Sequence, residues 1–405
     1  MFNDKPIIVF EMANNHMGDL DHGLLMIETF GNFVRDYSDF DFVFKFQFRD
    51  IPSFIHPDYK DRMDVKYVKR FSETALSKEQ FARMFDRVKS LGMKVMTTPF
   101  DENSVDLAEE LDVDIIKIAS CSCGDWPLLE RIIKVDKPIV FSTAGASFDT
   151  IDKMVSFFQH REKEFAIMHC VGEYPTTPDH LQVNQITQLK ERYPDVPIGF
   201  STHEDPQNYD SIYVAFGKGA QLFEKHVAVD TDQYPKNAYS ATPDDMKKWL
   251  DNARKAFQMM GVEKGRHPIA KKEEADLRQF RRGVFVNKAL DKGYTIQPGD
   301  LFYAWPCQDG QMVANDMSKY QTINTLKTIE CNGPVLFENV EITNNREKVY
   351  KIVQDIKALF KEAEVVYPGG AELEISHHYG VENFYETGIT MITVVNRQYC
   401  KKLIA

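Results

Sequence analysis

Polar side chains with chemical potential stand at or near the C-terminal ends of eight short apolar runs within roughly the first 230 residues. The runs are IIVFEMA (7–13), FDFVFKFQ (40–47), KVMTTPF (94–100), DIIKIAS (114–120), PIVFSTA (138–144), FAIMHCV (165–171), PIGFSTH (197–203) and LFEKHVA (222–228). Their ends carry Glu11, Lys45, Gln47, Thr97, Thr98, Lys117, Ser120, Ser142, Thr143, His169, Ser201, His203, Glu224 and His226. Cations, hydroxyls, carboxylates and imidazoles together suit the binding and conversion of a small anion.

Two lysines, Lys45 and Lys117, lie inside apolar runs, where an unpaired ammonium group is costly. One explanation is a buried ion pair with Glu11 or Glu224 as partner. The other is a cationic pocket for a phosphate or carboxylate group. In that pocket the hydroxyl donors would come from neighbouring run ends, at Ser120, Ser142, Thr143 and Ser201.

Two histidines, His203 and His226, end the seventh and eighth runs. Two imidazoles at neighbouring strand ends can hold one divalent metal, with water and substrate completing its shell. The alternative is a pair of ordinary hydrogen-bonded histidines. Glu11 is either a general acid or base with a raised pKa or a partner for Lys45. Tyr174 follows the sixth run and either lines the pocket or packs in a rigid turn.

The apolar runs alternate with stretches of helical periodicity, among them 78–92, 101–112, 148–160 and 243–261. Eight such alternations predict an α/β fold, a (β/α)8 TIM barrel ending near Gly261, which gathers the strand ends on one catalytic face. A doubly wound open sheet is the alternative. That fold usually carries a G-x-G-x-x-G loop after an early strand, and the sequence contains none.

The rest of the chain changes character after the barrel, and we expect four parts in all. Residues 1–262 form the barrel, and the charged stretch 263–281 is a linker. Residues 282–343 form a small β-rich module, with turns at DKG and QPGD. Residues 344–405 form a short α+β segment, with a helix over 346–363 and two or three strands over 371–405.

Composition narrows the function further. The 405 residues carry a formal net charge of −12, which argues against a nucleic-acid or anionic-membrane partner. No apolar run approaches the ~20 residues that span a bilayer, and no signal peptide is visible. The six cysteines are sparse and are expected to be reduced thiols. The expectation is a cytoplasmic protein.

The motifs match one family in order. EMANNHMGD resembles the AEIGxNHxG opening of sialic acid synthases, and KFQ, TTPFD, IKIAS, FSTAG, HCVGEYPT, GFSTHE and EKHVAVD resemble that family's successive strand-end motifs. Residues 282–343 resemble the antifreeze-like (SAF) domain that follows the barrel in the same family. The resemblance covers roughly residues 5–343.

The resemblance implies a metal-dependent synthase that condenses phosphoenolpyruvate with an aldose, releases phosphate and yields a nonulosonic, 2-keto-3-deoxy acid. It implies a domain-swapped homodimer and a divalent metal, normally Mn²⁺, with Mg²⁺ or Co²⁺ as alternatives. The carried-over roles are catalytic for Glu11, Lys45 and Lys117; phosphoenolpyruvate binding for Lys45, Lys117, Ser120, Ser142 and Ser201; metal binding for His203 and His226; and contact with the sugar for Glu11, Gln47 and Tyr174.

Two departures from the family fall on the acceptor side. Where the family has GPDHKxS, this chain has YPKNAYS (234–240), which puts Lys236 in place of an aspartate. Where the SAF domain has RPG, this chain has AWPCQDG, which puts Trp305 in place of an arginine. These changes invert one charge and remove a fork of donors. We therefore expect Gln47, Tyr174, Lys236 and Trp305 to bind a different aldehyde, acidic or phosphorylated, with Lys236 as counter-charge.

Two other functions remain open at this point. A class II-type aldolase would use the same barrel and metal but release no phosphate. A degenerate sugar-binding barrel would have lost catalysis, although the retained lysines and histidines argue against it. The segment 371–405, with LEISHHYG, faintly resembles the start of a cupin-type sugar domain.

Overall fold

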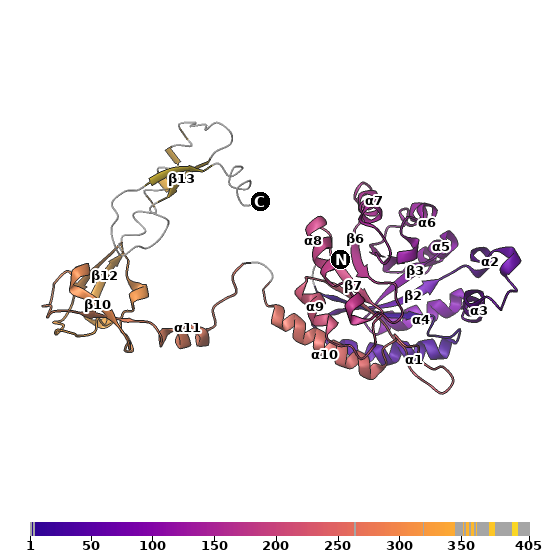
Figure 1. The fold of residues 1–405 in the computed structure, drawn as a ribbon, viewed down its shortest axis with the longest axis horizontal. Coiled ribbons are helices and arrows are strands. Elements are labelled where there is room, and N and C mark those ends of the chain that lie inside the picture. The colour runs from indigo at the N-terminus through magenta and orange to yellow at the C-terminus, as the bar shows by residue number, and fades with distance from the viewer. Residues whose placement is uncertain are drawn as a thin grey trace. The chain divides into compact units, whose positions relative to one another are not determined.

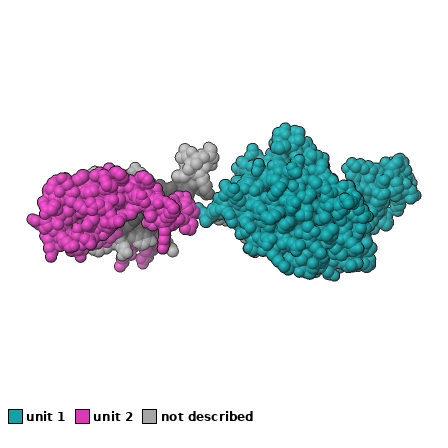
Figure 2. Space-filling view, turned by 90° about the horizontal axis from the view of Figure 1, so that it is seen from below, with its two compact units in different colours: residues 1–265 teal, residues 266–405 magenta. Residues whose placement is uncertain are grey.

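The structure is a computed structural model that describes Phe2, residues 5–262, 265–318 and 320–344, a few residues between 351 and 362, and the backbone of 372–376 and 391–395. The chain divides into two compact units, residues 1–265 and 266–405. Figure 2 draws the two units in different colours. Within the described part of the chain, no helix is long and apolar enough to cross a membrane.

The first unit is a closed barrel of eight parallel strands in sequence order. The strands are β1 (Ile7–Ala13), β2 (Asp41–Phe48), β3 (Lys94–Pro99), β4 (Ile115–Ile118), β5 (Ile139–Ser142), β6 (Phe165–Cys170), β7 (Ile198–Thr202) and β8 (Leu222–His226). Each coincides with one of the eight apolar runs, so the predicted (β/α)8 fold is confirmed.

Helices surround the strands (Figure 1). They are α1 (Leu20–Gly31), α2 (Ile51–Phe54), α3 (Lys66–Glu73), α4 (Lys78–Ser90), α5 (Glu102–Glu110), α6 (Trp126–Ile132), α7 (Phe148–Gln159), α8 (Asn184–Arg192), α9 (Ser211–Gly217) and α10 (Pro243–Met260). The side chains of Ser77, Asp101 and Thr242 cap the N-termini of α4, α5 and α10 by accepting backbone N–H bonds, which fixes where these helices begin.

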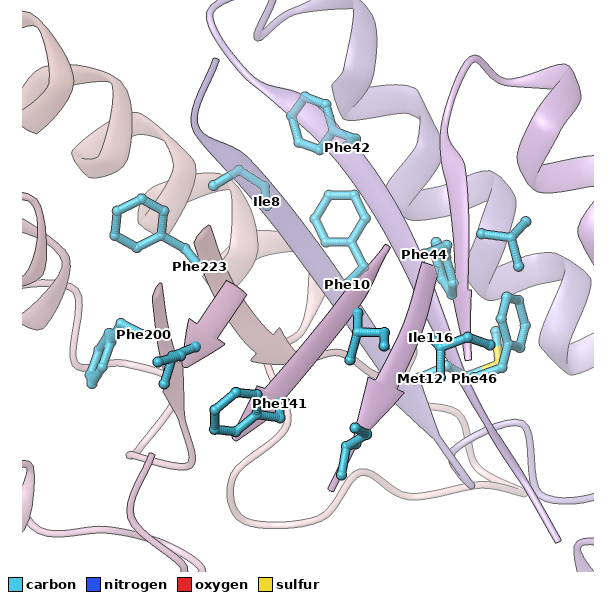
Figure 3. Packing of buried hydrophobic residues seen from close by; sticks show 14 of the residues in the cluster. Ile8, Phe10, Met12, Phe42, Phe44, Phe46, Ile116, Phe141, Phe200 and Phe223 are labelled. Atoms are coloured by element: carbon cyan, nitrogen blue, oxygen red, sulfur yellow. The ribbon is translucent and has the colours of Figure 1, made fainter. Parts of the chain in front are cut away.

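Alternate residues of each strand face opposite sides of the barrel wall. On β1, Phe10 packs outward with Phe42 and Phe44 in the layer between strands and helices (Figure 3). The residues between them point inward, where Ile7, Val9, Val43, Met96, Ile115, Val140, Ala166, Met168 and Leu222 form a separate apolar cluster with Phe2. This inner cluster fills the N-terminal part of the barrel, so polar side chains are left to its C-terminal part.

An insertion follows β2 and was not assigned from the sequence. It contains the short α2, a 3-10 turn (Pro57–Tyr59) and α3, and Figure 1 shows α2 and α3 at the edge of the barrel unit. Its apolar side chains include Phe54 and Phe71, whose rings lie 6.1 Å apart. The insertion precedes α4 and forms one wall of a cavity described below.

The second unit begins with α11 (Lys271–Arg278), inside the stretch expected to be a linker. Its β-rich part contains β9 (Gly283–Val286), β10 (Leu301–Ala304), β11 (Gln321–Thr325) and β12 (Val340–Asn344) in two antiparallel pairs around a small apolar core. A further pair is β13 (Glu372–Ser376) and β14 (Met391–Val395). The expected helix over 346–363 lies largely outside the described residues. The domain boundaries and the SAF and cupin resemblances stay predictions.

Candidate active site

Inside the barrel, a layer of polar side chains lies on the C-terminal side of the inner apolar cluster. Strand register places Glu11 beside Lys45 of β2 and beside His226 of β8, and Ser201 beside Glu224. These residues follow inward-facing apolar residues at a spacing of two along each strand. Because residues two positions apart face the same side of a strand, their side chains also point into the barrel. The closed sheet thus brings polar groups from distant parts of the sequence onto one face.

Glu224 is the centre of this layer. Its carboxylate accepts hydrogen bonds from Lys117 Nζ at 2.9 Å and from Ser201 Oγ at 3.0 Å. Lys45 Nζ lies 2.8 Å from Glu224 Oε1 and 2.7 Å from Glu11 Oε2. All four charged side chains are at least nine-tenths buried. Two carboxylates therefore neutralise two ammonium groups, which is the ion-pair arrangement that the sequence left as one of two alternatives.

Burial lowers the pKa of Lys45 to about 7, although attraction to Glu224 opposes that shift. The carboxyl of Glu224 keeps a pKa below its usual value because Lys117 and Lys45 outweigh its burial. The ionised state of the network thus depends on its members' mutual contacts. An anionic ligand entering here would meet two cations already held in place.

A chain of side-chain hydrogen bonds connects this polar layer with residues farther toward the C-terminal end of β2. Gln47 Nε2 donates to Glu11 Oε1 at 3.1 Å, and Gln47 Oε1 accepts from Arg49 Nη1 at 3.2 Å. The amide of Gln47 is thereby fixed in one orientation by partners on both sides. Gln47 thus connects Glu11 with Arg49, and its expected contact with the sugar stays a prediction.

The predicted serines occupy neighbouring strand ends. Ser142 ends β5, and its buried hydroxyl has no hydrogen-bond partner in the described part of the structure. Ser120 follows β4, and its Oγ accepts from the backbone N–H of Ala144 at 3.0 Å. Thr98 of β3, two positions after inward-facing Met96, also has a buried hydroxyl without a partner among the described residues. Unpaired buried hydroxyls facing a polar layer fit a ligand that would accept from them.

The two histidines lie together, with ring centroids 5.1 Å apart. His203 Nδ1 is 2.9 Å from the carbonyl oxygen of Val171, which fits a tautomer that donates there and leaves Nε2 free. His226 Nδ1 is buried and has no hydrogen-bond partner among the residues that the structure describes. Burial lowers the pKa of both imidazoles, so both are neutral, as metal ligands must be.

This donor pair fits a divalent metal, with the remaining ligands drawn from water and substrate. No group of three or more histidine, cysteine or carboxylate side chains suited to a metal occurs among the described residues. Two aromatic rings cover the pair. Tyr174 lies 4.2 Å from the His203 ring, and Tyr239 lies 5.1 Å from the His226 ring, centroid to centroid.

The last two predicted acceptor residues, Lys236 and Trp305, belong to different units of the chain. Lys236 is exposed in the loop after β8, where its backbone N–H donates to Asp230. Trp305 belongs to the second unit, is 65% exposed, and donates from its indole N–H to the carbonyl of Gln279. Among the described residues of the barrel unit, no contact joins the Lys236 side chain to the site lysines or histidines, and the roles of Lys236 and Trp305 stay predictions.

Three residues of the site were not predicted. Glu224 was considered only as an ion-pair partner, yet it links both lysines. Tyr239 was not considered at all. Arg49 could have been found, because KFQFR places Lys45, Gln47 and Arg49 in strict alternation with phenylalanines.

Protonation of the buried His16, which lies beside the site, should lower the stability of the fold in mild acid. Burial, followed by the charges of His22 and Arg70, lowers the pKa of His16 from 6.5 to about 4. Between these values the unfolded chain binds more protons than the folded one, so the stability present above pH 6.5 is lost as pH falls toward 4. The loss from this group amounts to about 3 kcal/mol.

Urea unfolding of wild type and His16→Gln between pH 4 and 7 checks this, with exposed His160→Gln as control. The His16 variant should lose stability less steeply than wild type on acidification, and the control should follow wild type. Equal slopes for all three proteins would contradict the assignment.

Comparison with known proteins agrees with this geometry. The sequence profile of the NeuB family matches residues 38–265, more than half of the chain. A crystal structure from Chromobacterium violaceum, provisionally assigned as spore coat polysaccharide biosynthesis protein E, is 47% identical, with a TM-score of 0.78 over 83% of this chain and 100% of that one. The N-acetylneuraminic acid (sialic acid) synthetase of Leptospira borgpetersenii, solved with citrate, is 26% identical, with a TM-score of 0.58 over 68% and 92%. The N-acetylneuraminate-9-phosphate synthase of Drosophila melanogaster is 28% identical over 329 residues, 74% of this chain and 86% of that protein.

Proposed function

Because the chain belongs to the NeuB family, we propose that it condenses phosphoenolpyruvate with an aldose to give a nonulosonic acid and phosphate. The observation that carries this proposal is the buried pair Lys45 and Lys117, held by one carboxylate at the C-terminal end of a closed barrel. Two fixed cations suit a ligand with two anionic groups, and phosphoenolpyruvate carries a carboxylate and a phosphate. The named relatives that are synthases of sialic acids support the same reaction class.

The chain's own residues then have distinct tasks. The lysines bind the carboxylate and phosphate and orient carbon 3 toward the aldehyde carbon. The hydroxyls of Ser120, Ser142 and Ser201 complete the phosphoenolpyruvate site. After carbon–carbon bond formation, water adds at carbon 2, and cleavage of the C–O bond expels phosphate. Glu11, beside Lys45, holds or accepts a proton at the aldehyde or water.

We also propose that His203 and His226 hold a divalent metal, normally Mn²⁺. Two neutral imidazoles, one of them with an unpartnered buried nitrogen, support this. When bound, such a metal supplies Lewis-acid polarisation of the aldehyde oxygen. Tyr174 and Tyr239, whose rings contact the histidines in tilted and edge-on arrangements, would limit the access of water to that end of the site.

The acceptor and the assembly belong to the same proposal. The Drosophila relative is named for a phosphorylated product and the Leptospira relative for an unphosphorylated one, so related chains differ in this respect. An acidic or phosphorylated aldose fits the presence of Lys236 where the family has aspartate. A domain-swapped homodimer would give the exposed Trp305 a surface to bury against.

The test is direct. The protein is incubated with phosphoenolpyruvate, Mn²⁺ and a panel of neutral, acidic and phosphorylated aldoses, while released phosphate is measured and products are weighed by mass spectrometry. The expected result is phosphate release with a product whose mass is that of phosphoenolpyruvate, the aldose and one water together, less phosphoric acid. Absence of phosphate with every acceptor would overturn the proposal, and an adduct formed from pyruvate without phosphate would indicate an aldolase.

A further inference from the structure

A cavity of about 550 Å³ lies between the end of β2, the α2–α3 insertion and the helices α4 and α5. This volume is within the range of small-molecule sites. Gln47, Asn14 and His16 line its inner side, and Arg49 lines its wall. Because Gln47 also donates to Glu11, the cavity continues outward from the reacting layer. The sequence alone predicted neither this cavity nor a ligand for it.

Arg49 is held in an unusual way. Its guanidinium carbon lies 4.0 Å from the ring centroid of Phe71 and 3.7 Å from that of Phe100, so two aromatic rings cover the group. Stacking of this kind fixes the guanidinium plane and leaves its donors pointing from the edge. One edge donor, Nη1, goes to Gln47, and Nε is buried without a partner.

No carboxylate among the described residues forms an ion pair with Arg49. The acidic groups around the cavity have other partners. Asp106 and Glu110 pair with Arg131 and Lys78 at 2.6 Å. Asp50 Oδ2 accepts from Asn103 at 2.9 Å.

Asp101, which attracts Arg49 electrostatically, accepts from the backbone N–H groups of Ser104 and Asp50. A second cation, Arg70 of α3, is close enough to influence the pKa of Arg49 and of Tyr239, and it too has no ion pair among the described residues. Burial lowers the pKa of Arg49 to about 10, so the group remains charged at neutral pH. A half-buried cation that no carboxylate contacts directly gains from a ligand that supplies an anion.

We propose that Arg49 binds an anionic substituent, a carboxylate or phosphate monoester, at the end of the acceptor aldose remote from its aldehyde. This rests on the proposed function and names the acceptor class. Lys45, Gln47 and Arg49 succeed one another at a spacing of two residues, so the Cα atoms of Lys45 and Arg49 are about 13 Å apart along an extended strand. That span accommodates a sugar between the reacting layer and the cavity. The structure thereby assigns the counter-charge to Arg49 rather than to Lys236.

The experiment compares three acceptors with the same stereochemistry: the neutral aldose, its 6-phosphate and its uronate. At saturating phosphoenolpyruvate, kcat/KM is measured for wild type, Arg49→Met, Arg49→Lys and Lys236→Asp. Wild type should prefer at least one anionic acceptor by about 10- to 100-fold, the factor that one charge-assisted contact supplies. Arg49→Met should abolish that preference through KM for the acceptor and leave KM for phosphoenolpyruvate unchanged.

Arg49→Lys should retain part of the preference for an anionic acceptor. Whether wild type prefers the 6-phosphate or the uronate shows which anionic group the site binds. An equal loss for neutral and anionic acceptors in Arg49→Met, or a preference abolished by Lys236→Asp alone, would overturn the assignment. Binding of the aldose 6-phosphate and the uronate by titration calorimetry, without phosphoenolpyruvate, separates the two proposals. Binding that requires Arg49 but not exposed Arg62 supports the subsite even if no phosphate is released. Phosphate release in which Arg49→Met leaves the activity on the anionic acceptors as high as in wild type supports the reaction and rejects the subsite.

Discussion

Glu224→Gln is expected to reduce condensation by about 10²- to 10³-fold, the range seen when one preorganised electrostatic group is removed. Glu224 contacts both lysines, so its neutral replacement leaves a surplus positive charge in a buried layer. The pKa of Lys45 is already about 7 because of burial, and loss of the Glu224 attraction would lower it further. Lys45 would then be neutral at neutral pH and could not hold an anion.

The same substitution should destabilise the fold by about 3–5 kcal/mol, since it breaks a buried ion pair from one side. A matched control is Glu204, which lies in the loop after β7 and pairs with Lys225 on the outward face of the Glu224 strand. Glu204 is equally buried and contacts Lys225 Nζ at 3.3 Å and Ser211 Oγ at 2.6 Å, among the outer helices. Glu204→Gln should lose similar stability in urea unfolding and keep its activity. If both variants lost activity in proportion to stability, the special role of Glu224 would be refuted.

His226→Ala is expected to abolish the response to Mn²⁺ and to lower turnover by about 10³-fold. A metal supplies several kcal/mol of stabilisation to developing charge, and each 1.36 kcal/mol is a factor of ten in rate. Chelation of the wild-type protein should cause the same loss, and added Mn²⁺ should reverse it only in wild type. Phosphate release and calorimetric Mn²⁺ titration provide the two readouts.

His169→Ala is the control for this experiment. His169 is buried on β6, two strands from His226, stacks on Phe200 and is 2.8 Å from the carbonyl oxygen of Leu181, so its removal should cost stability. The Mn²⁺ dependence of its activity should resemble that of wild type. Equal Mn²⁺ affinity in wild type and His226→Ala would sink the metal assignment.

The strands could be predicted because each combines an apolar run with a polar end, and the barrel follows from their number and order. The partners of the lysines could not. Glu224 and Lys117 are separated by 107 positions, and either Glu11 or Glu224 satisfied the sequence pattern equally well. Only closure of the sheet decides which carboxylate reaches which ammonium group. The α2–α3 insertion was missed because its helices have only four and eight residues, and neither contains a buried side chain.

The neutral balance between Glu11, Lys45, Glu224 and Lys117 has a consequence for selectivity. In the free protein the ammonium groups already have anions, so an entering ligand performs an ion exchange. The affinity of such a ligand reflects how much more strongly it binds the two lysines than Glu11 and Glu224 do. A monovalent anion such as chloride can replace only one contact and should compete poorly. A rigid dianion that contacts both lysines at once should displace the two carboxylates. The site should therefore select ligands by their charge as well as by their shape.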